Sequence, residues 1–70
     1  MRRQALASAS VASVGYDAAT ETLEVEFRNG NVYQYLGVAK RLYWGLMSAP
    51  SVGAFLNREI RDSHEFLRVR

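Results

Sequence analysis

Apolar and polar residues alternate along two neighbouring stretches in the first half of the chain. Residues 22–28 place Leu, Val and Phe between Glu, Glu and Arg, which is the period-two pattern of a strand with one buried face. Residues 31–36 form a second run, rich in Val and Tyr, and Asn29-Gly30 separates the two runs. Both of these loop residues tolerate the positive φ of a tight turn. The pattern therefore predicts a β-hairpin over residues 22–36.

A further strand is expected before this hairpin. Residues 10–16 are β-prone, and the run over residues 17–20 is typical of the turn that closes such a strand. Short connections favour a three-stranded antiparallel meander. Residues 1–9 show no periodic apolar residues that could be buried, so we expect a frayed N-terminus over this segment. Residues 67–70 are expected to form a C-terminal tail, for which a docked extension or a short edge strand is preferred over a free end because the segment is partly apolar.

Beyond the third strand the apolar period changes to that of a helix. The spacing predicts a first helix over residues 39–49. Pro50 cannot continue this helix, and Ser51 is suited to the N-cap of a second helix over residues 52–62. The expected fold is an α+β domain of order β-β-β-α-α over residues 10–66. Both helices are expected to pack on one face of a three-stranded antiparallel sheet.

The length of the hairpin loop decides which way Tyr33 and Tyr35 face. A two-residue loop of Asn29-Gly30 puts both rings on the face that carries the glutamates, whereas a three-residue loop that adds Arg28 puts both in the core. The first register separates polar from apolar residues more cleanly and is the one we favour. The second buries two large rings. Exposed rings would form a stacking platform for unpaired bases, whereas buried rings would belong to the core.

Composition narrows the classes of function. Seventy residues make one domain, and 9 basic against 7 acidic residues give a net charge of +2, which is compatible with a nucleic-acid partner but common among ordinary domains. The chain has no Cys and a single His, His64, so neither a metal site nor a cofactor is expected. No apolar run approaches the ~20 residues of a membrane span. We expect a cytoplasmic protein without membrane contact.

The sequence contains no recognisable set of catalytic residues. Asp62, Ser63 and His64 include the residue types of a nucleophilic triad, but neighbours in one segment point in different directions. Glu24 and Glu26 share a strand face at a separation of about 7 Å, which glycosidases also use. A domain of this size offers no deep sugar cleft, so a solvated strand face explains these two glutamates better. We therefore expect a protein that is not an enzyme and has no catalytic residues.

Basic and aromatic residues offer a binding surface instead. The candidates for stacking on bases and binding phosphates are Tyr33, Tyr35, Lys40, Arg41, Arg58 and Arg61. Of these, Arg58 and Arg61 are expected on the outward side of the second helix. Trp44 falls beside the apolar stripe of the first helix and is a candidate anchor for a protein partner. The alternative explanation is that the charges only confer solubility and that Trp44 covers the sheet edge.

Several short motifs, in their order and spacing, resemble the KTSC domain. They are Gly15-Tyr16-Asp17, Leu23-x-Val25-x-Phe27-x-x-Gly30-x-x-Tyr33-x-Tyr35, Val38, Ala49-x-Ser51-x-Gly53 and Phe55-x-Asn57-x-x-Ile60. The likeness covers residues 8–65, and the family's central Tyr-x-Tyr corresponds to Tyr33-Gln34-Tyr35. One departure is Val38-Ala39, where the family commonly has Val-Pro.

The resemblance to the KTSC domain also implies a function. The family is named for its occurrence at the C-terminus of some lysyl-tRNA synthetases, and it also occurs as a stand-alone small bacterial protein. The resemblance implies a small binding module with RNA, and tRNA first, as its ligand. The alternative expectation is a module for protein–protein interaction or homodimer formation.

Overall fold

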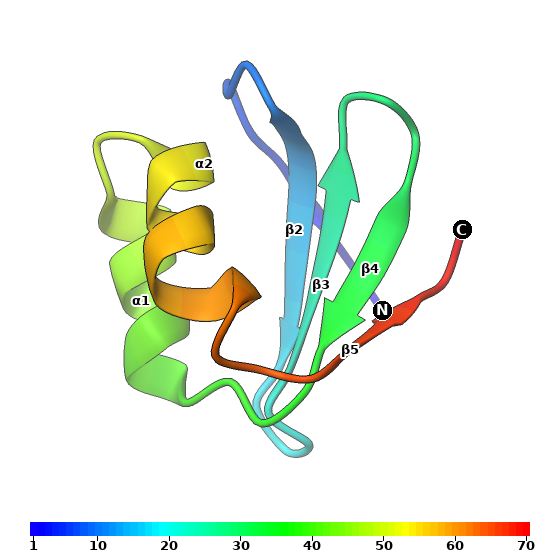
Figure 1. Ribbon diagram of the computed structural model, residues 1–70, viewed down its shortest axis with the longest axis vertical. Helices are drawn as coiled ribbons and strands as arrows, with labels where there is room; N and C mark the ends of the chain where they lie inside the picture. Colours follow the sequence, from blue (N-terminus) through cyan, green and yellow to red (C-terminus); the bar gives the residue numbers. More distant parts are fainter.

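The chain folds into a β-sheet with helices packed against one of its faces (Figure 1). The computed structural model describes residues 1–70. The strands are β1 (Gln4–Ala5), β2 (Val11–Asp17), β3 (Thr22–Phe27), β4 (Val32–Tyr35) and β5 (Phe66–Arg68). The helices are α1 (Lys40–Ser48) and α2 (Val52–Phe55), and α2 continues directly into the π-helix η1 (Leu56–Arg61). All neighbouring strands are antiparallel, in the order β1-β2-β3-β4-β5. The predicted α+β class is confirmed, but the predicted count of three strands is wrong.

The two strands beyond the predicted three, β1 and β5, form the edges of the sheet. Gln4 of β1 lies opposite Val14 of β2, and Leu67 of β5 lies opposite Gln34 of β4. The segments expected to be a frayed start and a tail thus contain paired strands, and the short edge strand preferred for the C-terminal end is present. Strands of two and three residues are too short to show a periodic pattern, which is why the alternation of apolar residues did not reveal them.

The β3–β4 hairpin has the three-residue loop. Val25 lies opposite Tyr33 and Leu23 lies opposite Tyr35. The backbone N–H of Phe27 donates to the carbonyl of Asn31 at 2.9 Å, which leaves residues 28–30 as the loop. Gly30 has a φ of +92°, a value that glycine adopts without strain. The two-residue loop that we favoured is therefore wrong, because it would have placed both tyrosines on the polar face.

The core lies between the sheet and the helices. The buried residues of the sheet include Leu23, Val25 and Tyr35, and those of the helices are Leu46, Leu56 and Ile60. Burying a side chain of this size contributes about 1.5–3 kcal/mol relative to leaving it exposed. The two helical segments approach closely at Gly45, where an added Cβ would lie 2.7 Å from the ring of Phe55. The small residue in α1 is thus explained by the ring that packs against it.

The opposite face of the sheet carries a polar network centred on Glu24. The Glu24 carboxylate is buried and accepts hydrogen bonds from Arg3 Nη1 at 2.6 Å and from Gln34 Nε2 at 2.9 Å. The neighbouring Glu26 accepts from Arg70 Nη2 at 2.9 Å. Burial raises the pKa of Glu24, but the bonds from Gln34 and Arg3 outweigh burial and hold that pKa below its usual value. The prediction of a solvated strand face is therefore wrong for Glu24.

Candidate functional site

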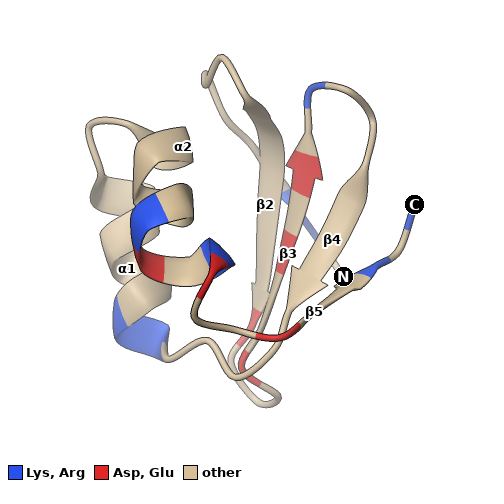
Figure 2. Ribbon diagram, viewed as in Figure 1, with Lys and Arg blue, Asp and Glu red and all other residues tan.

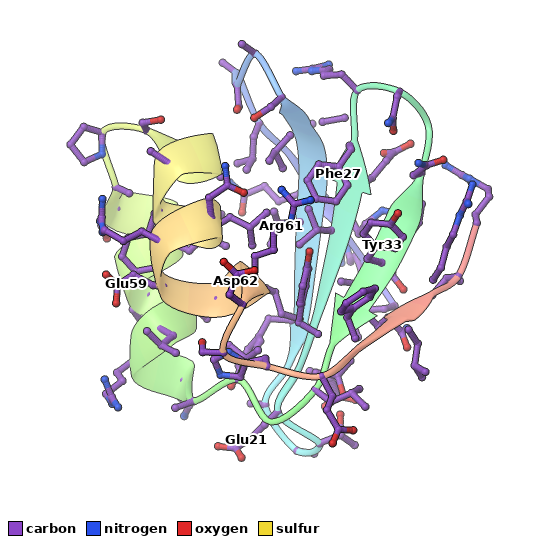
Figure 3. The ribbon with its side chains drawn as sticks, in the orientation of Figure 1. Glu21, Phe27, Tyr33, Glu59, Arg61 and Asp62 are labelled. Carbon is purple, nitrogen blue, oxygen red and sulfur yellow. The ribbon has the colours of Figure 1, made fainter.

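A cleft of about 200 Å³ lies between the β3–β4 hairpin and η1. The residues that line it are Phe27, Asn29, Asn31, Tyr33, Tyr35 and Arg61, a set that we call the aromatic–arginine cleft. In Figure 3, Phe27 and Tyr33 lie on the sheet and Arg61 extends from η1 toward them. No carboxylate lines the cleft. Its walls can therefore receive a flat ring on one side and a negative charge on the other.

The hairpin register positions the aromatic wall. Because residues of one strand alternate between faces, the three-residue loop directs Phe27, Tyr33 and Tyr35 to the helix side together. The rings of Phe27 and Tyr33 meet edge to face with their centroids 5.6 Å apart. Phe66 of β5 lies 5.6 Å from Tyr33 and 5.9 Å from Tyr35. Tyr35 belongs to the core and Tyr33 is half-buried, so the two rings do not form an exposed stacking platform.

The π-helix explains why Arg61 reaches the cleft. In an α-helix, five residues turn through about 500°, so Arg61 would lie about 140° away from the buried Leu56. In η1 the wider i→i+5 winding brings residues five apart to nearly the same side. Arg61 therefore follows Leu56 toward the sheet, and its Nη1 donates to Asn57 Oδ1 at 3.3 Å. Arg61 is exposed, as predicted, but it lines the cleft and so does not share one outward side with Arg58.

Three guanidinium groups of the β3–β4 loop, η1 and β5 have no carboxylate partner, Arg28, Arg61 and Arg68, and of these only Arg61 lines the cleft. Arg28 donates to the carbonyls of Leu6 and Ser8, and Arg68 Nη2 donates to Asn31 Oδ1 at 3.0 Å. Figure 2 shows basic positions in the β3–β4 loop and at the end of η1, with an acidic position beside the latter. These guanidinium charges remain available to an anionic ligand.

The Tyr35 hydroxyl opens into the cleft although its ring is buried. The hydroxyl makes no hydrogen bond within the chain. Every fully buried side-chain oxygen or nitrogen does have a partner, so this hydroxyl cannot be fully buried and is accessible from the cleft that Tyr35 lines. Burial raises the pKa of Tyr35, and the charge of Arg61 offsets this only in part. Asp62 raises the same pKa further, although less than Arg61 lowers it. The hydroxyl therefore stays protonated and can donate a hydrogen bond.

The other predicted binding residues lie outside the cleft. Lys40 and Arg41 begin α1, and neither makes an ion pair. Arg58 pairs with Glu59 at 2.9 Å and lies over the ring of Phe55. The structure thus brings together Tyr33, Tyr35 and Arg61 of the predicted set, and separates Lys40, Arg41 and Arg58 from them.

Trp44 lies on α1, away from the cleft. Its side chain is 60% exposed, and its ring contacts that of Tyr43 at a centroid distance of 5.5 Å. Tyr43 in turn stacks on Tyr16 of β2 at 4.6 Å. Trp44 is therefore the outermost member of a chain of rings that begins on the sheet.

A larger hollow, of about 410 Å³, lies beside the β1 edge of the sheet. Its aromatic residues, Tyr16 and Tyr43, already stack on each other, and the Tyr16 hydroxyl donates to the carbonyl of Val38 at 2.6 Å. Arg3, which also lines this hollow, is committed to Glu24. The aromatic rings and the Arg3 guanidinium of this larger space are thus already engaged within the chain, whereas Arg2 and Gln4 of its lining make no side-chain hydrogen bond.

Ser63 and His64 do make contact, with Ser63 Oγ and His64 Nδ1 2.9 Å apart. The same Nδ1 lies 3.0 Å from the carbonyl of Ile60, and Ser63 Oγ donates to the carbonyl of Glu59 at 2.9 Å. These two side chains therefore satisfy the last carbonyls of the helix, as residues that follow a helix commonly do. Asp62 makes no hydrogen bond to His64, so no carboxylate orients the imidazole.

The remaining members of the site were not predicted as binding residues from the sequence. Phe27, Asn29 and Asn31 line the cleft, and Phe66 and Arg68 contact its lining residues. The correct hairpin register would have placed Phe27 beside Tyr33. Phe66 and Arg68 were not assigned to this site from the sequence, because they reach it through the pairing of β5 with β4, and the whole helical segment separates these two strands in the chain.

The sequence of the chain was compared with models of known protein families and with solved structures. The model of the KTSC domain family matches residues 7–66. The chain belongs to the KTSC domain family. A crystal structure of a KTSC domain protein from Yersinia pestis is similar, with a TM-score of 0.93 and 37% identity, over 99% of this chain and 97% of that one. The resemblance drawn from the sequence is therefore confirmed, and the fold is shared with an experimentally determined KTSC structure.

Two relatives of this KTSC domain differ in length. A protein of Stutzerimonas stutzeri, described only as uncharacterised, is 39% identical over 64 residues, which cover 91% of this chain and 90% of that protein. A lysine–tRNA ligase of Nostoc punctiforme is 37% identical over 51 residues, which cover 73% of this chain but 9% of the ligase. The domain thus resembles both a protein of similar size and a small part of a large enzyme. Neither helical segment here is long and apolar enough to cross a membrane.

Proposed function

We propose that this KTSC domain is a non-catalytic RNA-binding module that holds one unpaired nucleotide in the aromatic–arginine cleft. The observation that carries this proposal is that Phe27, Tyr33 and Arg61 line one cleft without a carboxylate. Stacking of a base on an aromatic ring contributes about 1–3 kcal/mol. Guanidinium groups without a carboxylate partner supply the complementary charge for phosphates. The two kinds of group together suit a nucleotide better than either an apolar ligand or a free anion.

The relationship to a lysine–tRNA ligase supports the choice of RNA. The name of the Nostoc punctiforme enzyme gives tRNA as the molecule on which it acts, and part of that enzyme resembles this chain. We therefore take tRNA as the first RNA to test. Binding without catalysis is supported by the helix-terminal contacts of Ser63 and His64, which leave no activated nucleophile.

The test is a titration of the domain with labelled single-stranded RNA octamers and with bulk tRNA. Fluorescence anisotropy is measured at low and at physiological salt, because phosphate contacts weaken steeply as salt rises, with log K falling by about 0.7 per contact for single strands. We expect Arg61→Gln to weaken binding about three- to tenfold and to lower the salt slope by about 0.7. Absence of binding to every RNA at low salt would refute the proposal.

Arg58→Gln is the matched control. It makes the same change of charge and shape on the same helix, but Arg58 pairs with Glu59 and lies over Phe55 rather than in the cleft. We expect this variant to bind RNA as the original domain does. If Arg58→Gln and Arg61→Gln weaken binding equally, the contact is a diffuse one with the whole helix, and the cleft is not the site.

A second candidate function is self-association through α1. The observation that favours it is Trp44, which is 60% exposed and lies within one turn of Lys40 and Arg41. Large exposed aromatic residues are common anchors of protein interfaces. Sedimentation velocity over a wide concentration range tests this candidate. A dimer that Trp44→Ala abolishes would support it, and a strict monomer at the highest concentration would exclude it.

A further inference from the structure

The open edge of β5 exposes large apolar side chains, whereas the strand at the other edge does not. β5 runs along the outside of β4, and no strand of the chain covers its other side (Figure 1). Phe66, Leu67 and Val69 are each more than half exposed. The other edge strand, β1, contains only Gln4 and Ala5. Of the two edges, β5 is therefore the one that gains from pairing with a further strand.

The charged side chains of β5 do not block this edge. Arg68 Nη2 donates to Asn31 Oδ1 at 3.0 Å, and Arg70 Nη2 donates to a carboxylate oxygen of Glu26 at 2.9 Å. Both guanidinium groups thus turn back over the sheet of their own chain instead of extending across the open side. Natural sheets commonly protect an edge with charges that face an incoming strand. The arginines of β5 do not give this protection.

The hydrogen bonds to β4 show which backbone groups of β5 are free. The carbonyl of Glu65 and the N–H of Val69 both bond toward β4, at 2.8 and 2.7 Å. In an antiparallel ladder the backbone groups of alternate residues point to the same side. Phe66 and Arg68 therefore direct their N–H and C=O groups to the open side. No backbone bond in a turn, loop or cap uses these groups, so they can bond to another strand.

We propose that β5 pairs antiparallel with β5 of a second copy of this chain, which joins the two sheets into one. The free backbone groups fix the register. With Leu67 opposite Leu67 of the second copy, Phe66 lies opposite Arg68 of the second copy, and the free groups of both residues are satisfied. A shift by one residue would oppose free groups to groups already bonded to β4. A shift by two would oppose arginine to arginine, or use the groups of Phe66 alone.

The side chains that this register brings together are compatible. Leu67 meets its copy at the two-fold axis, on the face of the sheet that carries the polar network, with Cα atoms about 4.5 Å apart. On the helix face, Phe66 packs beside the aliphatic part of Arg68 of the second copy. The two Arg68 residues are only diagonal neighbours, about 7–8 Å apart. A strand this short buries little area, so we expect a weak dimer, with a Kd between about 1 μM and about 1 mM.

The test is analytical ultracentrifugation of the domain from about 10 μM to about 1 mM. Salt is held at about 0.15 M to screen the net charge of +2 on each copy. We expect a monomer–dimer equilibrium. Leu67→Lys and Leu67→Glu each place like charges at the axis, and each should weaken the dimer about tenfold. An equal mixture of the two variants places opposite charges there and should restore association.

Ala5→Lys is the matched control, because it adds a lysine at an exposed position of the other edge strand. We expect this variant to dimerise as the original domain does. Circular dichroism and the urea midpoint check that each variant is folded, which we expect because Leu67 is exposed. Recovery of the dimer in the mixture also requires that both Leu67 variants are folded.

Single cysteines test the register, because the chain has no Cys of its own. Leu67→Cys places two thiols across the axis at a Cα separation within the range of about 4.4–6.8 Å that disulfides span, so mild oxidation should give a covalent dimer. Val69→Cys is the control. Val69 is exposed to the same degree, but in this register it lies about 13 Å along the strand from its copy and should stay uncoupled.

The outcomes decide between β5 and other surfaces. A strict monomer at about 1 mM would overturn the inference, and so would a dimer that both charged Leu67 variants leave intact. A dimer that only Trp44→Ala abolishes would assign self-association to α1 and overturn it as well. Loss of the dimer in each Leu67 variant, with recovery in their mixture, would support it. The inference does not rest on RNA binding, so either proposal can fail while the other stands.

Discussion

The polar network on the open face of the sheet makes a prediction about stability that can be worked out in detail. Glu24 is 6% exposed and accepts one hydrogen bond from Arg3 and one from Gln34. Glu24→Gln keeps the size of the side chain, so it creates no cavity. The new amide has one oxygen for two donors, and its own NH₂ then faces a donor. The substitution thus removes the charge and one acceptor from a buried site.

The expected magnitude follows from these contacts. A hydrogen bond to a charged group contributes about 1.5–3 kcal/mol. Because Arg3 is 25% exposed and can return to water, we take about 2 kcal/mol as the loss in the free energy of unfolding. For a domain of this size each 1 kcal/mol lowers the melting temperature by about 4–8 °C. Urea denaturation should show a midpoint lower by about 2 M at a typical m-value of about 1 kcal/mol/M.

The pH dependence provides a sharper criterion than the magnitude. The pKa of Glu24 is below its ordinary value of 4.5 in the folded chain, so its contribution is complete above that value and is lost as pH falls through the lower, folded pKa. Glu24→Gln cannot titrate. The difference in stability between the two proteins should therefore be largest near neutral pH and should narrow in acid.

Glu65→Gln is the control for this experiment, because Glu65 is exposed and its side chain makes no ion pair. We expect its free energy of unfolding to stay within about 0.5 kcal/mol of that of the original protein at every pH. If Glu24→Gln is as stable as Glu65→Gln, or if the gap between Glu24→Gln and the original protein does not narrow in acid, the reasoning about this network is wrong.

Three further predictions concern the hairpin, the edge strand and α1. Gly30→Ala should lower the free energy of unfolding by about 1–2 kcal/mol, measured by urea denaturation, because a Cβ is strained at a φ of +92°; an unchanged midpoint would contradict the loop assignment. Phe66→Ala should lower it by about 1–1.5 kcal/mol, because this ring is 55% exposed and about half of its apolar area is at stake; a loss above about 3 kcal/mol would show that β5 unfolds with it. Trp44, the single Trp, should emit as a solvent-exposed indole and be quenched readily by iodide; a blue-shifted, protected spectrum in dilute solution would contradict its placement.

The inner part of the fold was predictable from the sequence because burial imposes a period. Leu23, Val25 and Phe27 alternate with polar residues since one face of β3 packs on the core. The edge strands were not predictable in this way. Their pairing is accompanied by the contacts of Arg3 with Glu24 and of Arg70 with Glu26, which join residues 21 and 44 positions apart. Such contacts leave no local pattern in the sequence.

The candidate site was only partly predictable, for two physical reasons. The loop length that turns Tyr33 and Tyr35 inward was one of two registers that the residues allow, and the choice depends on the total area that the domain can bury. The direction of Arg61 depends on π-helical winding, whereas apolar spacing alone suggests an α-helix. The hairpin loop and the second helix both depart from their commonest forms. The sequence pattern therefore identified some of the residues of the site but not the cleft that they form.

The two edges of the sheet are made by the two ends of the chain, and this has a consequence for aggregation. β1 and β5 are two and three residues long and exposed, so they open at a lower free energy than the core does. While they are paired, they cover the backbone groups of β2 and β4 that would otherwise accept a strand from another molecule. Proteolytic loss of a few residues from either end would therefore turn a well-behaved domain into a template for intermolecular strand pairing, with its core still intact.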